Sequence, residues 1–304
     1  MLPVEGMVDT QLQDQYVMLC KTVEYCLDSH FGDAESMIAS LSKVGLSESR
    51  RNLVSDHLPE RLVLLADGNR NLEIPMMQGL VCCYLYEKLL RTERIFPGLD
   101  QATEACLGMI IDGMNFLKPA KDQTAVQMWR VDLQRTLHAD EQSKRLRENE
   151  LREIEATIMR CLQLLKGTGL RVRSRDLSLC SRFVQEAGSL AENIRESMAE
   201  YELDYNYGPL VINEERFKDF TIVDSRTGCP LRSTAVPVAG PSRRVGEVLF
   251  TVYLAFVRKS SDSSKKIVLV KSTMVVEFGH PVPRGRKSHS SHGMTEVVES
   301  PWIL

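Results

Sequence analysis

Three alternating arginines form the part of the sequence best suited to binding a charged ligand. Arg171, Arg173 and Arg175 lie in the stretch LRVRSRD, between two segments with helical periodicity. Arginines that alternate along a loop can neutralise successive phosphates of a nucleic acid. No aromatic or base-reading motif interleaves with them, and the chain has a net charge of −3. A phosphate or nucleic-acid contact at these residues is therefore an alternative hypothesis and not the favoured one.

The cysteines and histidines show no spacing typical of a catalytic or metal-binding site. A zinc site needs three or four converging ligands, whereas the sequence offers only the neighbours Cys82-Cys83 and the pair His289 and His292. The chain has no GxSxG motif, P-loop or dinucleotide-binding loop. His138, like the other histidines of the helical region, is expected to be a surface or capping residue. The sequence predicts no catalytic residue, no cofactor and no metal.

One densely charged stretch, EQSKRLRENELRE, mixes both signs within an otherwise helical pattern. Opposite charges spaced four residues apart support one another on the surface of a helix. We therefore expect a solvated helix face and not an acid–base pair. The charged side chains of this face are Arg145, Arg147, Glu148, Glu150, Arg152, Glu153 and Glu155.

The elements that must position these residues fall into two groups, which predict an α+β fold that is mainly α. Residues 11–205 repeat apolar side chains at three- and four-residue steps and predict a helical bundle. Residues 206–279 are rich in β-branched side chains and predict a small antiparallel sheet packed on that bundle. Residues 1–10 are expected to be a flexible N-terminus, and residues 280–304 a disordered tail.

Two apolar runs near the end of the chain are expected to pair as a hairpin. They are Val248–Val257, VLFTVYLAFV, and Ile267–Phe278, IVLVKSTMVVEF, joined by a polar linker. Side chains alternate between the two faces of a strand. Because the second run turns polar on one face, only its first part is expected to be covered on both sides.

Composition points to a protein of the cell interior. The 304 residues are long enough for one large domain or two, since domains typically hold roughly 100–200 residues. The opening residues lack a secretory signal, and no apolar run reaches the length of a membrane span. Most of the eight cysteines lie in apolar helical segments and are expected to be reduced. We expect the cytoplasm or the nucleus, with PRGRK of the tail as a weak candidate import signal.

The second half of the chain resembles a loose set of fungal-type proteins of unassigned activity. The resemblance rests on AVQMWRVDLQRTL, QEAGSLAENIRESMAEYELDY and IVLVKSTMVVEF, between Ala125 and Phe278. In that set a helical domain is followed by a tyrosine-bearing amphipathic helix and a few strands. Some relatives carry DNA-binding segments ahead of this domain, whereas residues 1–30 here show none. The resemblance implies a regulatory or interaction role and supplies no catalytic residue.

These observations lead to one favoured function and one alternative. The favoured function is a non-enzymatic intracellular interaction or regulatory protein with a protein partner, associated in our hypothesis with transcriptional control. The alternative is an enzyme, or an accessory protein of a biosynthetic pathway, with a small-molecule pocket in the helical bundle, because bundles can form such pockets without a sequence motif.

Overall fold

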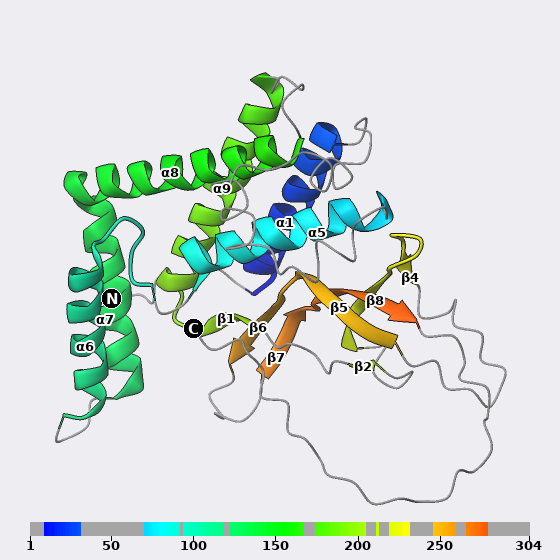
Figure 1. The fold of residues 1–304 in the computed structure, drawn as a ribbon. Helices are drawn as coiled ribbons and strands as arrows, with labels where there is room; N and C mark the ends of the chain where they lie inside the picture. Colours follow the sequence, from blue (N-terminus) through cyan, green and yellow to red (C-terminus); the bar gives the residue numbers. More distant parts are fainter. Residues whose placement is uncertain are drawn as a thin grey trace, which may run out of the picture.

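A computed structural model places a bundle of long helices against two small β-sheets (Figure 1). It describes residues 9–31, 70–91, 94–117, 122–166, 174–204, 211–212, 219–231, 246–259 and 266–278. The predicted flexible N-terminus lies outside these residues up to position 8, and the predicted disordered tail lies outside them entirely. The helices are α1 (Asp9–Phe31), α5 (Arg70–Leu85) with the π-helical turn η1 (Tyr86–Leu90), α6 (Gln101–Asn115), α7 (Gln123–Ala139), α8 (Glu141–Lys166) and α9 (Ser174–Glu196).

The strands form two sheets, and the predicted α+β, mainly α fold class is confirmed. The first sheet has the order β1-β6-β7 and the second the order β2-β5-β8-β3-β4. All pairs are antiparallel except β3 and β8, which run parallel. The strands are β1 (Tyr201–Asp204), β2 (Val211–Ile212), β3 (Thr221–Asp224), β4 (Pro230–Leu231), β5 (Gly246–Tyr253), β6 (Ala255–Lys259), β7 (Lys266–Val270) and β8 (Thr273–Phe278).

The two apolar runs pair with each other, but each is divided between the sheets. The first run breaks at Leu254 into β5 and β6, and the second breaks at Lys271 and Ser272 into β7 and β8. β6 pairs with β7 in the first sheet, and β5 pairs with β8 in the second. The short strand β1 joins β6 from a position ahead of residue 206, where the sheet region was expected to begin.

The expectation that only the first part of the last run is covered on both sides is wrong. β7 is the edge strand, and its Val268 is 54% exposed. β8 lies between β5 and β3, and its Met274, Val275 and Val276 are buried from both faces, whereas Glu277 near its end is exposed. Val275 belongs to the main core under the helices, whereas Met274 and Val276 belong to a second apolar cluster on the opposite face.

Close packing joins the helices to the sheets. A Cβ on Gly79 of α5 would lie 2.8 Å from the carbonyl oxygen of Thr251, so glycine lets this helix approach β5. The Tyr16 hydroxyl of α1 donates a 2.7 Å hydrogen bond to the carbonyl oxygen of Leu254. The ring of Phe256 lies 5.5 Å from that of Tyr16 between centroids. Helices and sheets therefore share one core.

Candidate functional site

The arginines predicted to contact phosphate are not seen as a cluster in the described part of the chain. Arg171 and Arg173 lie outside the described residues. Arg175 lies in the first turn of α9, and its side chain is also outside them. The phosphate contact at these three residues stays a prediction.

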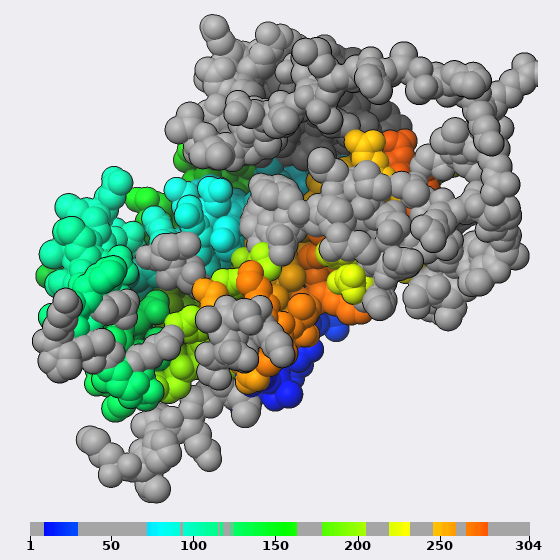
Figure 2. Space-filling view, turned by 90° about the horizontal axis from the view of Figure 1, so that it is seen from below, coloured from blue at the N-terminus to red at the C-terminus, as the bar shows by residue number. Residues whose placement is uncertain are grey.

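Helix α6 exposes an apolar face. Met109 and Phe116 are 68% and 81% exposed, and Ile110 and Leu117 are also exposed. Large apolar side chains gathered on one surface mark interaction sites more often than singly scattered ones do. α6 and α7 lie side by side at one end of the molecule (Figure 1). In the view from below, the teal atoms of α6 lie at the left surface (Figure 2).

The opposite side of α6 packs on α7. Its residues Leu107, Ile111 and Met114 are partly buried and lie one turn apart, and α7 is the helix that α6 contacts. The helix follows the N-cap Asp100, whose carboxylate accepts a 3.0 Å hydrogen bond from the backbone N–H of Thr103. This hydrogen bond, with a second from the Thr103 hydroxyl, lowers the pKa of Asp100. α6 thus has an inner apolar stripe that packs and an outer one that does not.

A tight loop fixes the start of the α6–α7 pair on α8. Gly98 has a φ of +88°, and a Cβ there would lie 2.5 Å from the carbonyl oxygen of Leu146. Only glycine fits such a position without strain. Next to it, Phe96 is fully buried, with its ring 5.3 Å from that of His138. The loop is therefore held by close packing on α7 and α8.

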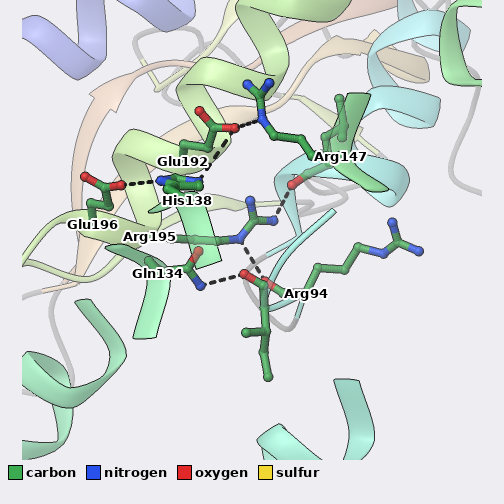
Figure 3. A network of polar contacts seen from close by, with 9 residues as sticks. Arg94, Gln134, His138, Arg147, Glu192, Arg195 and Glu196 are labelled. Atoms are coloured by element: carbon green, nitrogen blue, oxygen red, sulfur yellow. Dashed lines mark hydrogen bonds and ion pairs between the residues drawn. The ribbon is translucent and has the colours of Figure 1, made fainter. Parts of the chain in front are cut away.

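A buried guanidinium also holds this loop (Figure 3). The Nε of Arg195, on α9, donates a 2.8 Å hydrogen bond to the carbonyl oxygen of Arg94. Its Nη2 donates to the carbonyl oxygen of Leu89. From α7, the Nε2 of Gln134 donates a 2.6 Å hydrogen bond to the carbonyl oxygen of Ile95. Two side chains thus satisfy backbone acceptors that no regular element pairs.

Two carboxylates lie near the buried guanidinium of Arg195. Burial lowers the pKa of Arg195 to about 10, and the nearby carboxylates of Glu192 and Glu104 oppose that shift. The residue is therefore cationic at neutral pH. No carboxylate bonds it directly among the described contacts, and its Nη1 is buried without a hydrogen-bond partner. The nearby carboxylates and the hydrogen bonds to backbone carbonyls both stabilise the charge.

His138 joins α7 to α9 within the network. Its Nδ1 lies 2.7 Å from Glu196 Oε1, and its Nε2 lies 3.8 Å from Glu192 Oε1. Glu192 also accepts a hydrogen bond from the Nε of Arg147, on α8. His138 is 24% exposed and lies in the last turn of α7, so it is a partly buried residue that joins two helices rather than a fully exposed one. Arg147 likewise leaves the predicted solvated face to make this tertiary ion pair.

The network has the chemistry of a joint between helices. A histidine acting in acid–base catalysis needs a substrate or nucleophile within hydrogen-bond reach. Nε2 of His138 is buried and accepts or donates no hydrogen bond within the described structure. Within the same residues, no three His, Cys, Asp or Glu side chains gather as a metal ion would require. The network instead connects α7, α8 and α9 to the loop that leads into α6.

The thiols are mostly unreactive in their surroundings. Burial raises the pKa of Cys20 to about 12 and also raises that of Cys82, so both remain protonated. All eight cysteines are free, and Cys106 of α6 and Cys229 are the exposed ones.

Sequence reasoning missed both the exposed face of α6 and the role of Arg195. A helix that is apolar nearly all round is normally buried. The segment GMIIDGM of α6 is apolar at all but one of its non-glycine positions, which could have indicated a face in need of a partner. Arg195 follows Val184, Gly188 and Ala191 on one buried row of α9, where a charge needs a partner. Its acceptors are backbone carbonyls, which have no signature in the sequence.

Comparisons with known proteins add no relative: no family model matches the chain, and neither do curated proteins or solved structures. Among the helices that the structure describes, none combines the length and apolar character needed to cross a membrane.

Proposed function

We propose that this protein is a non-enzymatic interaction or regulatory protein that binds a protein partner through the outer face of α6. The observation that carries the proposal is the exposure of Met109, Ile110 and Phe116 on α6 and its C-cap, while the loop before α6 packs closely on α8. Burying one large apolar side chain contributes roughly 1.5–3 kcal/mol. Three such side chains supply enough free energy to anchor an interface.

The base of α6 supports this proposal because it limits movement of the face. The loop before α6 is fixed by Gly98 on α8 and by the hydrogen bond from Arg195 to the carbonyl oxygen of Arg94. A surface that is already ordered loses less conformational entropy when it binds. A rigid, apolar and exposed helix is therefore suited to recognition.

The protein would act inside the cell, in the cytoplasm or the nucleus, and the process that it regulates would be transcription. The free thiols at all eight cysteines support a reducing compartment.

Affinity capture from the native cell, compared across three chains, tests the proposal. The chains are the wild type, a Met109→Glu/Phe116→Glu variant, and an Ile267→Glu/Val268→Glu variant of the exposed edge strand as matched control. We expect a partner protein that the wild type and the control bind and the α6 variant loses. Identical partners for all three chains would refute a role for α6. A stoichiometric organic cofactor in the purified chain, detected by native mass spectrometry, would favour the enzyme or accessory protein of a biosynthetic pathway.

A further inference from the structure

The outer face of α6 has the periodicity of a helix–helix contact. Its exposed residues Ala105, Cys106, Met109, Ile110 and Gly113 follow one another at steps of one, three, one and three residues. Such steps form a continuous stripe along one side of a helix. From Ala105 to Phe116 the stripe extends over roughly 17 Å, at about 1.5 Å per residue. A straight apolar stripe of this length matches the apolar face of a second helix.

Small residues on the stripe permit a close approach. A Cβ added at Gly113, on the stripe, would meet no atom within 4 Å, and the same holds for Gly108 beside it. Ala105 and Gly113 lie on either side of Met109, which is 68% exposed. Large and small side chains therefore alternate along the stripe, as in the ridges and grooves of packed helices.

The charged residues of α6 and its N-cap are all acidic. Between residues 100 and 117 the chain carries Asp100, Glu104 and Asp112, and no lysine or arginine. Glu104 is directed to the Arg195 side, where it contributes to the electrostatics of that guanidinium. Asp100 and Asp112 are exposed near the two ends of the helix, roughly 18 Å apart along its axis. On α7, the exposed Arg135 pairs with Asp132 at 3.7 Å.

These charges distinguish between candidate occupants. A second copy of the chain would place one acidic helix on another, and like charges across an interface oppose association. An anionic membrane surface would be repelled in the same way. We propose that the outer face of α6 binds an amphipathic helix that carries lysine or arginine beside its apolar stripe. This inference rests on the proposed function and specifies the class of partner.

Two synthetic peptides test the charge of the partner. Both are 18-residue amphipathic helices with leucines at steps of three and four; one carries lysine at every polar position and the other carries glutamate. Alkylation of Cys106 on α6 reports occupancy, and Cys229, the other exposed cysteine, is the internal control. We expect the lysine peptide to protect Cys106 and leave Cys229 reactive, with affinity at least tenfold above that of the glutamate peptide.

Variants of the protein separate the stripe from its charge. Ile110→Asp should abolish protection of Cys106, whereas Val268→Asp, at an exposed position of β7, should not change it. Asp112→Lys should lower the affinity for the lysine peptide by about threefold or more, because an exposed ion pair is lost and replaced by a repulsion. The same variant should raise the affinity for the glutamate peptide.

Other outcomes would overturn the inference without touching the proposed function. Equal protection by both peptides, or protection only by the glutamate peptide, would exclude a basic partner. Protection of Cys106 that grows with protein concentration, with dimers in sedimentation velocity, would identify a second copy. Alkylation of Cys106 far slower than that of Cys229 at every concentration would show that the chain itself covers α6. Protection by vesicles of anionic phospholipid would identify a membrane. The proposed function fails separately, if cellular partners do not depend on α6.

Discussion

The Nε of Arg195 donates a hydrogen bond of 2.8 Å to the carbonyl oxygen of Arg94, across 101 positions of the sequence. This contact joins the C-terminal turn of α9 to the loop between η1 and α6. The loop then passes Gly98 and begins α6 at Asp100. The orientation of the exposed helix is therefore set by the buried polar network, although no residue of the network lies on its outer face.

Replacement of Arg195 should be strongly destabilising. In Arg195→Met, the carbonyl oxygens of Leu89 and Arg94 lose their donors, and each unsatisfied buried group costs about 1–3 kcal/mol. We expect the free energy of unfolding to fall by about 3 kcal/mol in urea denaturation. Arg182→Met on the same helix breaks only an exposed pair with Glu186 and should change it by less than about 0.5 kcal/mol. Equal effects of the two substitutions would contradict this role.

Gly98 and Gly108 should respond in opposite directions to alanine. Gly98→Ala places a Cβ against the Leu146 carbonyl at a φ of +88°, so we expect a loss of at least about 1 kcal/mol. Gly108→Ala meets no atom within 4 Å inside α6 and should gain about 0.5–1 kcal/mol from helix propensity. Thermal unfolding of both variants checks the prediction. A stabilised Gly98→Ala would show that the loop is free to adopt another conformation.

Periodicity was sufficient for the bodies of the helices and insufficient for their ends. The predicted apolar positions Phe183, Ala187 and Ile194 of α9 are buried, because the local pattern and the core agree. Beyond them Met198 and Tyr201 continue the same spacing of four and three residues, but α9 ends at Glu196. Tyr201 begins β1, which pairs with Arg258 of β6, and such a distant pairing has no local signal.

The charged stretch of α8 shows which contacts local reasoning can predict. Arg152 and Glu148 form the expected exposed pair four residues apart, at 3.2 Å. Glu150 instead lies 3.3 Å from Nη1 of Arg94, and Arg147 pairs with Glu192. Spacing along one helix identifies neighbours on that helix alone. Partners from other elements become known only when the fold brings them together.

The stability of the first sheet should depend on pH through Glu202. Partial burial raises the pKa of this carboxyl, but hydrogen bonds from Lys266 and Lys259 outweigh it, so the pKa is lowered. Because the pKa of Glu202 is lower in the folded state, its ion pairs stabilise the fold above the unfolded-state pKa of about 4.3. This stabilisation is lost as the pH falls through the folded-state pKa. Lys266→Met should lower the free energy of unfolding by up to about 1 kcal/mol at pH 7, since these side chains are partly exposed. The decrease should be smaller at pH 3.

Lys266 itself adds a change of opposite sign at high pH. Its hydrogen bonds to Glu202 and Asp204 raise its pKa, so this contribution is present below the unfolded value of about 10.4 and is lost as pH rises through the folded one. Urea denaturation between pH 3 and 11 checks the loss of stability at low pH and the loss at high pH, with Lys266→Arg as the charge-preserving control. A pH profile of Lys266→Met parallel to that of the wild type would contradict the assignment.

Thiol labelling should divide the cysteines into two kinetic classes. Cys106 and Cys229 are exposed and should react rapidly with iodoacetamide at pH 8. Cys20 and Cys180 should react only after unfolding, because burial raises the pKa of both thiols and also restricts access. Mass spectrometry of timed samples, with a urea-denatured control, gives the order. Fast labelling of Cys20 in the folded protein would mean that α1 separates from the sheet.

The outer side chains of α6 should contribute to binding and not to folding. Met109→Glu/Phe116→Glu changes two side chains that are 68% and 81% exposed, so the free energy of unfolding should change by less than about 0.5 kcal/mol per substitution. Phe96→Ala, at the fully buried base of the same helix, should cost about 3–5 kcal/mol. Urea denaturation measures both, and partner capture is measured on the same samples. Lost binding with unchanged stability in Met109→Glu/Phe116→Glu assigns the outer face to recognition. Stability lost in parallel with that of Phe96→Ala would make this face part of the protein's own core.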